Sequence, residues 1–290
     1  MRNAFAIAPR GPFSWELALE MLGNFPPTSH HPIERQVTRM AFPLDGTFEP
    51  AHVALWWEGG ELQGGVAGAT PVDAVRAQVA RVFSLDVDGS GYPEVGERDP
   101  VIGALMRERP GQRPVLFTSP YECAAWGVIS QRISRAQAAR IKDRLLRDGC
   151  FPPPQRLLEL DVIPGLTAPK AERLRGIARA ALRGDLDPVR LAAMGDAAPE
   201  FLRRLPGIGE FWSQGIYARA CTAPDAFPGE QASLDAIASL YGPGHNLAEI
   251  TDRWRPFRMW VTVLVRLTVG RRTPTSRARG RPSDRRSPAR

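Results

Sequence analysis

The feature that most constrains this chain is the run Leu-Pro-Gly-Ile-Gly at 205–209, which lies between two segments of helix-forming composition, 199–204 and 210–221. Two glycines two residues apart allow a tight turn with positive φ, and the proline fixes φ at its entry. The first N–H groups of the second segment have no carbonyl partner within the helix, and the helix dipole favours an anion there. The run therefore predicts a helical hairpin that binds phosphate. The alternative is an ordinary corner between core helices, which Gly-x-Gly alone does not exclude.

Charge is concentrated at one end of the chain. The 290 residues carry a formal net charge of +7, and the arginines of residues 271–290 account for all of it. Residues 1–270 are therefore formally neutral. The Pro-, Ser- and Arg-rich composition of 271–290 predicts a disordered basic tail. Such a tail either binds polyanions in a salt-sensitive way or is a solvated appendage with no specific role.

The cysteines and the apolar runs bear on the compartment. Cys123, Cys150 and Cys221 lie far apart without a Cys-x-x-Cys motif. This indicates structural thiols in a reducing cytoplasm and disfavours a four-cysteine iron–sulfur cluster. The N-terminus lacks a basic-then-apolar signal sequence, no apolar run reaches membrane-spanning length, and the histidines lack metal-ligand spacing. We therefore expect a soluble cytoplasmic protein without a metal site.

The first 115 residues predict a small α+β domain. A helix is expected over 13–22, with Ser14 as its N-cap, and another over 71–83, followed by a loop over 84–96. Three further segments alternate in polarity or are rich in β-forming residues, and Gly, Asp and Pro separate them, which predicts a small antiparallel sheet. These segments are 36–42, 52–57 and 61–68.

From residue 119 to about 270 the pattern is helical. The expected helices lie within 119–134, 135–149, 152–160, 168–182 and 201–221, with a short one after 228. No internal repeat is visible at a fixed period. The segment 116–270 is therefore predicted to be an all-α domain.

Three motifs carry a family resemblance: Leu-Pro-Gly-Ile-Gly at 205–209, Pro-Asp-Ala-Phe-Pro at 224–228 and Arg-Trp-Arg-Pro-Phe-Arg at 253–258. In this order, and with the Gln-x-x-Ser loop at 131–134, they resemble the alkylpurine (3-methyladenine) branch of the helix-hairpin-helix DNA glycosylase superfamily. The resemblance covers most of residues 10–268. It implies an α+β N-terminal domain (1–115), a helical helix-hairpin-helix domain (116–270) and the tail (271–290).

The resemblance also implies where duplex DNA binds. The hairpin contributes backbone groups, and the loop that these enzymes push into the minor groove contributes side chains. The implied DNA-binding residues are Leu205, Gly207, Ile208, Gly209, Gln131, Arg132 and Ser134. Arg132 takes the position of the side chain inserted where the base was flipped out, although an exposed loop arginine with no such role is an equal alternative. Family members often hold a monovalent cation on the hairpin carbonyls, which the resemblance permits here, and no other cofactor is expected.

The main departure from the family pattern concerns catalysis. The family stabilises the sugar cation with an Asp shortly after the hairpin, and Gln231 occupies that position here. A neutral amide cannot offset a positive charge as a carboxylate does. Glu230 stands beside it, and Asp235 lies one helical turn further on, although taken alone Asp235 is better explained as a surface carboxylate of a helix. Three interpretations stay open: an active enzyme using Glu230 or Asp235, a slow enzyme, and a damage-binding protein without turnover.

Aromatic residues complete the expected site. Phe211, Trp212 and Trp126 are candidates for a pocket that attracts a cationic alkylated purine, with core packing as the alternative; Trp254 is expected in the core. Relatives that also cut the strand carry a Lys at the position of Phe211, so base removal is expected to leave an uncut abasic strand.

The sequence thus predicts a monomeric, monofunctional DNA N-glycosylase that excises alkylated bases in base-excision repair. Its expected partner is double-stranded DNA with alkylated bases, which would associate it with the nucleoid, and no membrane contact is expected. The alternative is a non-catalytic or weakly active DNA-binding protein that recognises damaged or distorted duplex.

Overall fold

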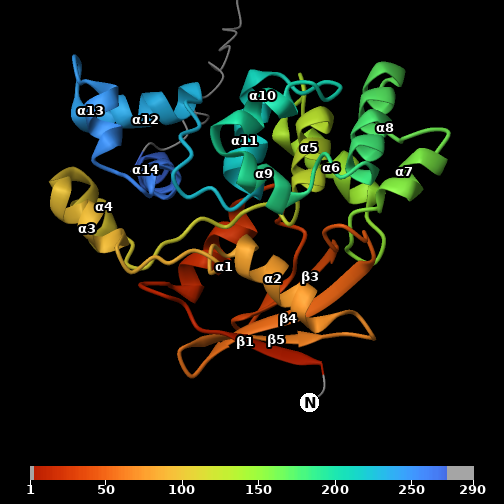
Figure 1. The fold of residues 1–290 in the computed structure, drawn as a ribbon, viewed down its shortest axis with the longest axis horizontal. Helices are drawn as coiled ribbons and strands as arrows, with labels where there is room; N and C mark the ends of the chain where they lie inside the picture. The colour runs from red at the N-terminus through yellow and green to blue at the C-terminus, as the bar shows by residue number, and fades with distance from the viewer. Residues whose placement is uncertain (1–2, 273–290) are drawn as a thin grey trace, which may run out of the picture.

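The computed structural model describes residues 3–272, and the side chains of residues 3–270. An N-terminal antiparallel sheet is followed by a helical region, which confirms the predicted fold class (Figure 1). The strands are β1 Ala4–Ile7, β2 Ile33–Glu34, β3 Val37–Pro43, β4 Pro50–Glu58 and β5 Glu61–Val66, in the order β1-β5-β4-β3-β2. The three predicted strands are confirmed as β3, β4 and β5. The short outer strands β1 and β2 were not predicted.

One face of the sheet packs on the core because apolar side chains alternate along its strands. Burial alternates along β4, with Val53 and Leu55 on the covered face, and Met40 of β3 pairs directly with Val53. The helices α1 and α2 lie on this side of the sheet (Figure 1). Ser14 caps α1 as predicted, because its Oγ accepts a hydrogen bond from the N–H of Leu17 at 3.3 Å.

One helix, α1, lies between β1 and β2, and the other helices follow the sheet and extend to residue 272. They are α1 Trp15–Asn24, α2 Val72–Val82, α3 Tyr92–Arg98, α4 Pro100–Glu108, α5 Pro120–Ile129, α6 Arg135–Leu145, α7 Pro154–Glu159, α8 Ala168–Leu182, α9 Pro188–Met194, α10 Ala198–Leu202, α11 Glu210–Ala220, α12 Gln231–Tyr241, α13 Leu247–Asp252 and α14 Arg258–Arg272, with a 3-10 turn η1 at Gly195–Ala197. The helix predicted over 168–182 is confirmed with the same bounds as α8.

Two local expectations were wrong. The loop expected over 84–96 gives way to α3 at Tyr92, because Pro93 suits the first helical turn and Tyr92 and Val95 are buried. The helix expected up to Gly149 ends at Leu145, since Leu146 has an extended backbone and residues 147–150 form a turn closed by two hydrogen bonds between Arg147 and Cys150.

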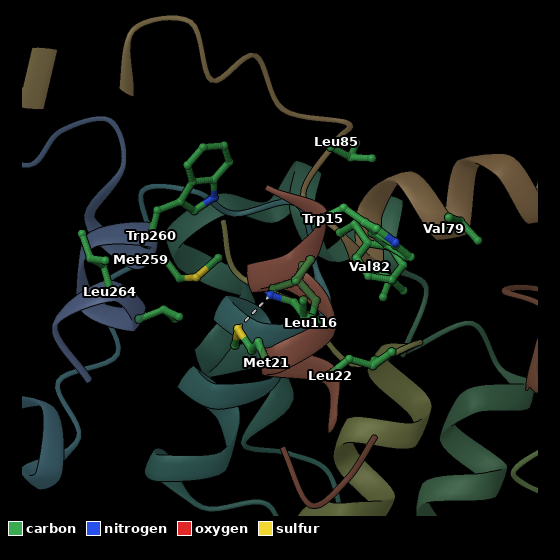
Figure 2. Packing of buried hydrophobic residues seen from close by; sticks show 14 of the residues in the cluster. Trp15, Met21, Leu22, Val79, Val82, Leu85, Leu116, Met259, Trp260 and Leu264 are labelled. Atoms are coloured by element: carbon green, nitrogen blue, oxygen red, sulfur yellow. Dashed lines mark hydrogen bonds between the residues drawn. The ribbon is translucent and has the colours of Figure 1, made fainter. Parts of the chain in front are cut away.

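Buried apolar residues form two clusters. The first joins the sheet and α1–α4 to α12–α14, and the second fills the space among α5–α11. Figure 2 shows part of the first cluster, including Met259 and Trp260 of α14, Met21 of α1 and Leu116. Trp254, expected in the core, is fully buried in this cluster. The division of the chain into domains at residues 115 and 270 stays a prediction.

Only the first two residues of the predicted C-terminal tail belong to the part of the chain that the structure describes. The backbone of residues 271 and 272 continues α14, and residues 273–290 lie outside the described part of the chain. Within residues 3–272, no helix is both long enough and apolar enough to cross a lipid bilayer.

Candidate nucleic-acid interface and active site

The predicted hairpin is formed by α10 and α11 (Figure 1). Gly207 has φ +79°, in the left-handed region that favours glycine, whereas Gly209 has φ −92° and is the N-cap of α11. The side chains of Leu205 and Ile208 are buried in the second cluster, and the N–H of Ile208 donates to the carbonyl of Leu205 at 3.1 Å. These two side chains anchor the turn in the core, so only their backbone is suited to a ligand.

The N-terminus of α11 is open to solvent. Gly209 is exposed, no side chain caps the helix, and a Cβ placed on Gly209 would have no atom within 4 Å. The first-turn N–H groups have no helical carbonyl to which they can donate. An anion such as a phosphate can therefore approach the bare backbone at this point.

The loop between α5 and α6 is tied to the hairpin through Gln131. Its Nε2 donates to the carbonyl of Gly207 at 2.6 Å, and its Oε1 accepts from Arg173 Nη1 at 3.2 Å. Lys170 Nζ donates to the carbonyls of Ile129 and Gln131. Burial lowers the pKa of Lys170, and the charge of Arg173 lowers it further. The two segments predicted to contact DNA are thus joined. The DNA-binding role of Gln131 stays a prediction.

Arg132 stands at the tip of this loop. It is exposed and has φ +57°, an unfavourable conformation for a residue other than glycine, asparagine or aspartate. Among the described residues it has no ion-pair partner. Ser134 caps α6, since its Oγ accepts from the N–H of Gln137 at 3.2 Å. The loop therefore presents an unpaired guanidinium on a constrained backbone, and the proposed roles of Arg132 and Ser134 towards DNA stay predictions.

Two aromatic side chains mark the start of α11. Phe211 is 55% exposed, Trp212 is half-buried, and their ring centroids lie 5.3 Å apart at 87°. The indole of Trp212 lies against Gly127 of α5, where a Cβ would be only 2.9 Å from Trp212 Cδ2. Trp126, in contrast, is 5% exposed and packs in the second cluster. Phe211 and Trp212 form an accessible aromatic surface beside the hairpin. That these two residues and Trp126 form a pocket for the base stays a prediction.

The candidate catalytic residues lie at the start of α12, and they have different partners. Glu230 is the N-cap of α12, and its Oε1 accepts from Arg266 Nη1 at 3.0 Å and from Ser233 Oγ at 3.1 Å. Gln231 and Asp235 are exposed and bond to each other, with Gln231 Nε2 donating to Asp235 Oδ1 at 2.7 Å. The charge of Glu230 is therefore compensated by a cation, whereas Asp235 accepts its hydrogen bond from a neutral amide.

An ion cluster that was not predicted from the sequence joins two of the family-like motifs. Asp225 accepts two hydrogen bonds from Arg258, both at 3.0 Å, and pairs with Arg255. The carbonyl of Pro224 accepts from the N–H of Met259 at 2.9 Å. The cluster holds the segment that leads to Glu230 against the start of α14. The sequence signal for this cluster is the opposite charge of the two motifs. Lys170 and Arg173, which bond to the loop at Gln131, were also not predicted, because nothing in the sequence distinguishes them from the other basic residues of α8.

The fold is that of the helix-hairpin-helix DNA glycosylases. A 3-methyladenine DNA glycosylase from Archaeoglobus fulgidus superposes with a TM-score of 0.71 over 92% of this chain and 98% of that chain, at 23% identity. A Schizosaccharomyces pombe 3-methyladenine DNA glycosylase in complex with abasic DNA matches 61% of this chain and 97% of that chain, with a TM-score of 0.51 and 19% identity. At these identities the likeness shows the fold alone.

The sequence is similar to the alkylpurine branch of these enzymes, which confirms the predicted resemblance. The chain is 30% identical over 204 residues to a probable bifunctional transcriptional activator/DNA repair enzyme AlkA of Mycobacterium tuberculosis, covering 64% of this chain and 41% of that protein. It is 27% identical over 203 residues to a DNA-3-methyladenine glycosylase of Bacillus subtilis, covering 62% of this chain and 67% of that protein. The chain thus spans less than half the length of the mycobacterial relative. No family model matches the chain.

Proposed function

We propose that this protein is a DNA N-glycosylase of base-excision repair that removes alkylated bases of the 3-methyladenine type from duplex DNA. The observation that carries the proposal is the open N-terminus of α11 at Gly209, tied through Gln131 to a loop with an unpaired arginine. Backbone N–H groups fix a phosphate without reading sequence, and a loop side chain fills the gap left by a flipped base. The names of the sequence relatives support the same substrate class.

We further propose that the catalytic carboxylate is Asp235, with Gln231 as its positioning residue. Breaking the base–sugar bond creates positive charge on the sugar, which a nearby negative charge stabilises. Arg266 Nη1 lies 3.0 Å from Glu230 Oε1, and its positive charge offsets the negative charge of Glu230. Glu230 can therefore stabilise the sugar cation less. The neutral amide of Gln231 orients Asp235 without compensating its charge.

The proposed product is an abasic site in an uncut strand. Strand cleavage of the lyase type needs a primary amine that attacks the sugar, and Phe211 occupies the family position of that lysine. We propose that the protein acts as a monomer. The hairpin carbonyls are also candidates for a monovalent cation: the carbonyl of Gly207 accepts a hydrogen bond from Gln131 and keeps a second lone pair.

The test is single-turnover base release from methylated duplex DNA, with DNA binding measured in parallel. Wild type should release alkylated purine and leave the DNA strand intact. The product strand should break at the abasic site only after treatment with heat or alkali. Asp235→Asn should slow release by about 100-fold with little loss of binding, whereas Glu230→Gln should slow it less. Strand cleavage by the protein itself would refute the monofunctional proposal.

The second candidate function is recognition of damaged DNA without turnover. Gln231 at the family's carboxylate position favours it. Wild type that binds methylated duplex in preference to unmethylated duplex, but releases no base, would replace the enzyme proposal with this one.

A further inference from the structure

Helix α8 contacts both segments that are proposed to hold DNA. A Cβ on Gly176 of α8 would lie 2.7 Å from Cγ of Pro206 in the hairpin turn, so the turn packs closely on this helix. The stem of Arg173 lies against Gly207, where a Cβ would be 2.9 Å from Arg173 Cδ. One helical turn before Arg173, Lys170 bonds to the loop that follows α5. Helix α8 is therefore a common support for the hairpin and the loop.

Lys170 binds the backbone at the point where α5 ends and the loop begins. Its Nζ donates to the carbonyl of Ile129, the last residue of α5, at 3.0 Å, and also to the carbonyl of Gln131. The last carbonyls of a helix have no N–H partner within it, and the helix dipole favours a cation beside them. Lys170 is half-buried and forms no ion pair with a carboxylate of residues 3–270. Its described partners are these backbone carbonyls.

The carbonyl of Gln131 belongs to the peptide unit that leads directly into Arg132. The angle φ of Arg132 is the rotation that follows this unit, and a left-handed value such as +57° costs about 1–2 kcal/mol for a residue with a Cβ. Such a conformation persists only where the surrounding structure holds it. Lys170 holds the carbonyl of Gln131, while the side chain of Gln131 is bound at one end by Arg173 and at the other by Gly207.

We propose that Lys170 is a positioning residue for base release, which holds the left-handed backbone of Arg132 and so fixes where that side chain enters the duplex. The inference rests on the proposed function. Lys170 acts through Arg132 and is not itself in contact with the DNA. Without the ammonium, the peptide unit before Arg132 loses a partner, φ can return to negative values, and the guanidinium no longer has one position. The loss then falls on filling the gap left by the flipped base.

The test compares Lys170→Met, which keeps an unbranched stem and removes the ammonium, with Arg175→Met as the matched control. Arg175 is also a basic residue of α8 that donates to loop carbonyls, those of Leu160 and Asp161 in the connection between α7 and α8. Single-turnover release of alkylated base from methylated duplex should slow about tenfold or more in Lys170→Met and less than about twofold in Arg175→Met. DNA affinity should fall much less than the rate. An unchanged rate in Lys170→Met would overturn the proposal.

A double-mutant cycle with Arg132→Asn separates a positioning role from a direct DNA contact. Asparagine tolerates positive φ, but its side chain is too short to fill the gap. In the Arg132→Asn background, Lys170→Met should therefore have little further effect on the rate. Lys170→Arg, which keeps a cation that donates to carbonyls, should recover most of the wild-type rate. Equal losses in both backgrounds, with a salt slope shallower by about one, would show that Lys170 binds phosphate and would overturn the proposal.

A second variant covers a failure to fold. Should thermal unfolding show that Lys170→Met is not folded, Lys170→Gln replaces it in the same cycle. The glutamine side chain is one bond shorter and uncharged, so it cannot bind both carbonyls as the ammonium does. The expected results and the results that would overturn the proposal are the same for both variants.

A second readout separates the inference from the proposed activity. Duplex with a stable abasic-site analogue and 2-aminopurine opposite it reports a side chain that enters the gap, because the fluorescence of 2-aminopurine depends on its stacking. At saturating protein, wild type and Arg175→Met should change this fluorescence more than Lys170→Met does. No change with wild type, or equal changes with wild type and Lys170→Met, would overturn the inference. Wild type that changes the fluorescence but releases no base would overturn only the proposed function.

Discussion

Gln231 and Asp235 form a hydrogen-bonded pair one helical turn apart on the exposed side of α12, with the amide nitrogen 2.7 Å from the carboxylate oxygen. An amide that donates to a carboxylate fixes its orientation and leaves its negative charge in place. Gln231, which the resemblance sets at the family's carboxylate position, therefore donates to a carboxylate that forms no ion pair among the described residues.

Restoring the family's carboxylate should raise activity. Gln231→Asp adds a negative charge in the first turn of α12 and should raise the rate of base release by about tenfold or more, even though it loses the hydrogen bond to Asp235. Ala232→Asp, which adds the same charge at the exposed neighbouring position, is the control and should have a smaller effect. Equal rates for both variants would show that net charge alone acts.

The two hairpin glycines should respond in opposite ways. Gly207→Ala should lower the free energy of unfolding by about 1 kcal/mol, because φ is +79° and the new Cβ would lie 2.9 Å from Arg173 Cδ. Gly209→Ser should raise it by a few tenths of a kcal/mol, roughly the gain from an added N-cap. The serine Oγ should also occupy a first-turn N–H of α11 and weaken DNA binding. Denaturant unfolding and DNA titration measure both effects, and unchanged DNA affinity in Gly209→Ser would exclude this phosphate site.

The packing of Trp212 against α5 should be sensitive to one methyl group added at Gly127. Gly127→Ala places a Cβ 2.9 Å from the indole, so the ring has to move. The free energy of unfolding should therefore fall by about 1–3 kcal/mol. Gly215→Ala approaches the same indole only to 3.7 Å and removes a helix-interior glycine, so it should stabilise by about 0.5–1 kcal/mol. Similar behaviour of the two variants in thermal unfolding would contradict the described packing.

Arg132 should contribute to DNA affinity through charge. Arg132→Asn keeps a residue type that tolerates positive φ, so stability should be retained. The slope of log affinity against log salt should become shallower by about one. Arg183→Asn, which removes an arginine paired with Asp185, is the comparison and should change the slope less. A slope unaffected by Arg132→Asn would mean that this loop does not reach the DNA.

Stability should fall in mild acid because of His30 and His31, whose pKa values are lowered by burial. Their pKa values lie below 6.5 in the folded protein, with that of His30 at about 4, so the unfolded chain binds more protons between these values. Their contribution is fully present above about pH 6.5 and is lost as the pH falls towards about 4. Denaturant unfolding at several pH values measures this slope. It should be shallower in His31→Gln, and an equal slope would locate the titrating group elsewhere.

Local signals made several elements predictable. Pro164-Gly165 before α8 and the apolar spacing along it define that helix, and serines 14, 119 and 134 cap their helices as short-range chemistry requires. The strand β1 was missed because its pairing partner β5 lies some sixty residues further on, and only that pairing gives so short a segment a structure.

The candidate site was predictable only as motifs. Hairpin, loop and carboxylates each have a sequence signature, but the contacts between them do not. The bonds of Gln131 to Gly207 and to Arg173 join residues 76 and 42 positions apart. The compensation of Glu230 by Arg266 likewise depends on α14 returning to α12, which no local pattern encodes.

The membership of α14 residues in the same apolar cluster as α1 and the sheet has a consequence for biosynthesis. Met259, Trp260 and Leu264 complete a cluster whose other members include Trp15 and Met21 (Figure 2). A nascent chain that has not yet released α14 from the ribosome therefore carries the N-terminal sheet and α1 with apolar surface still uncovered. The sheet and α1 are thus made well before the helix that completes their cluster, and a fragment that stops before residue 258 would leave this apolar surface exposed.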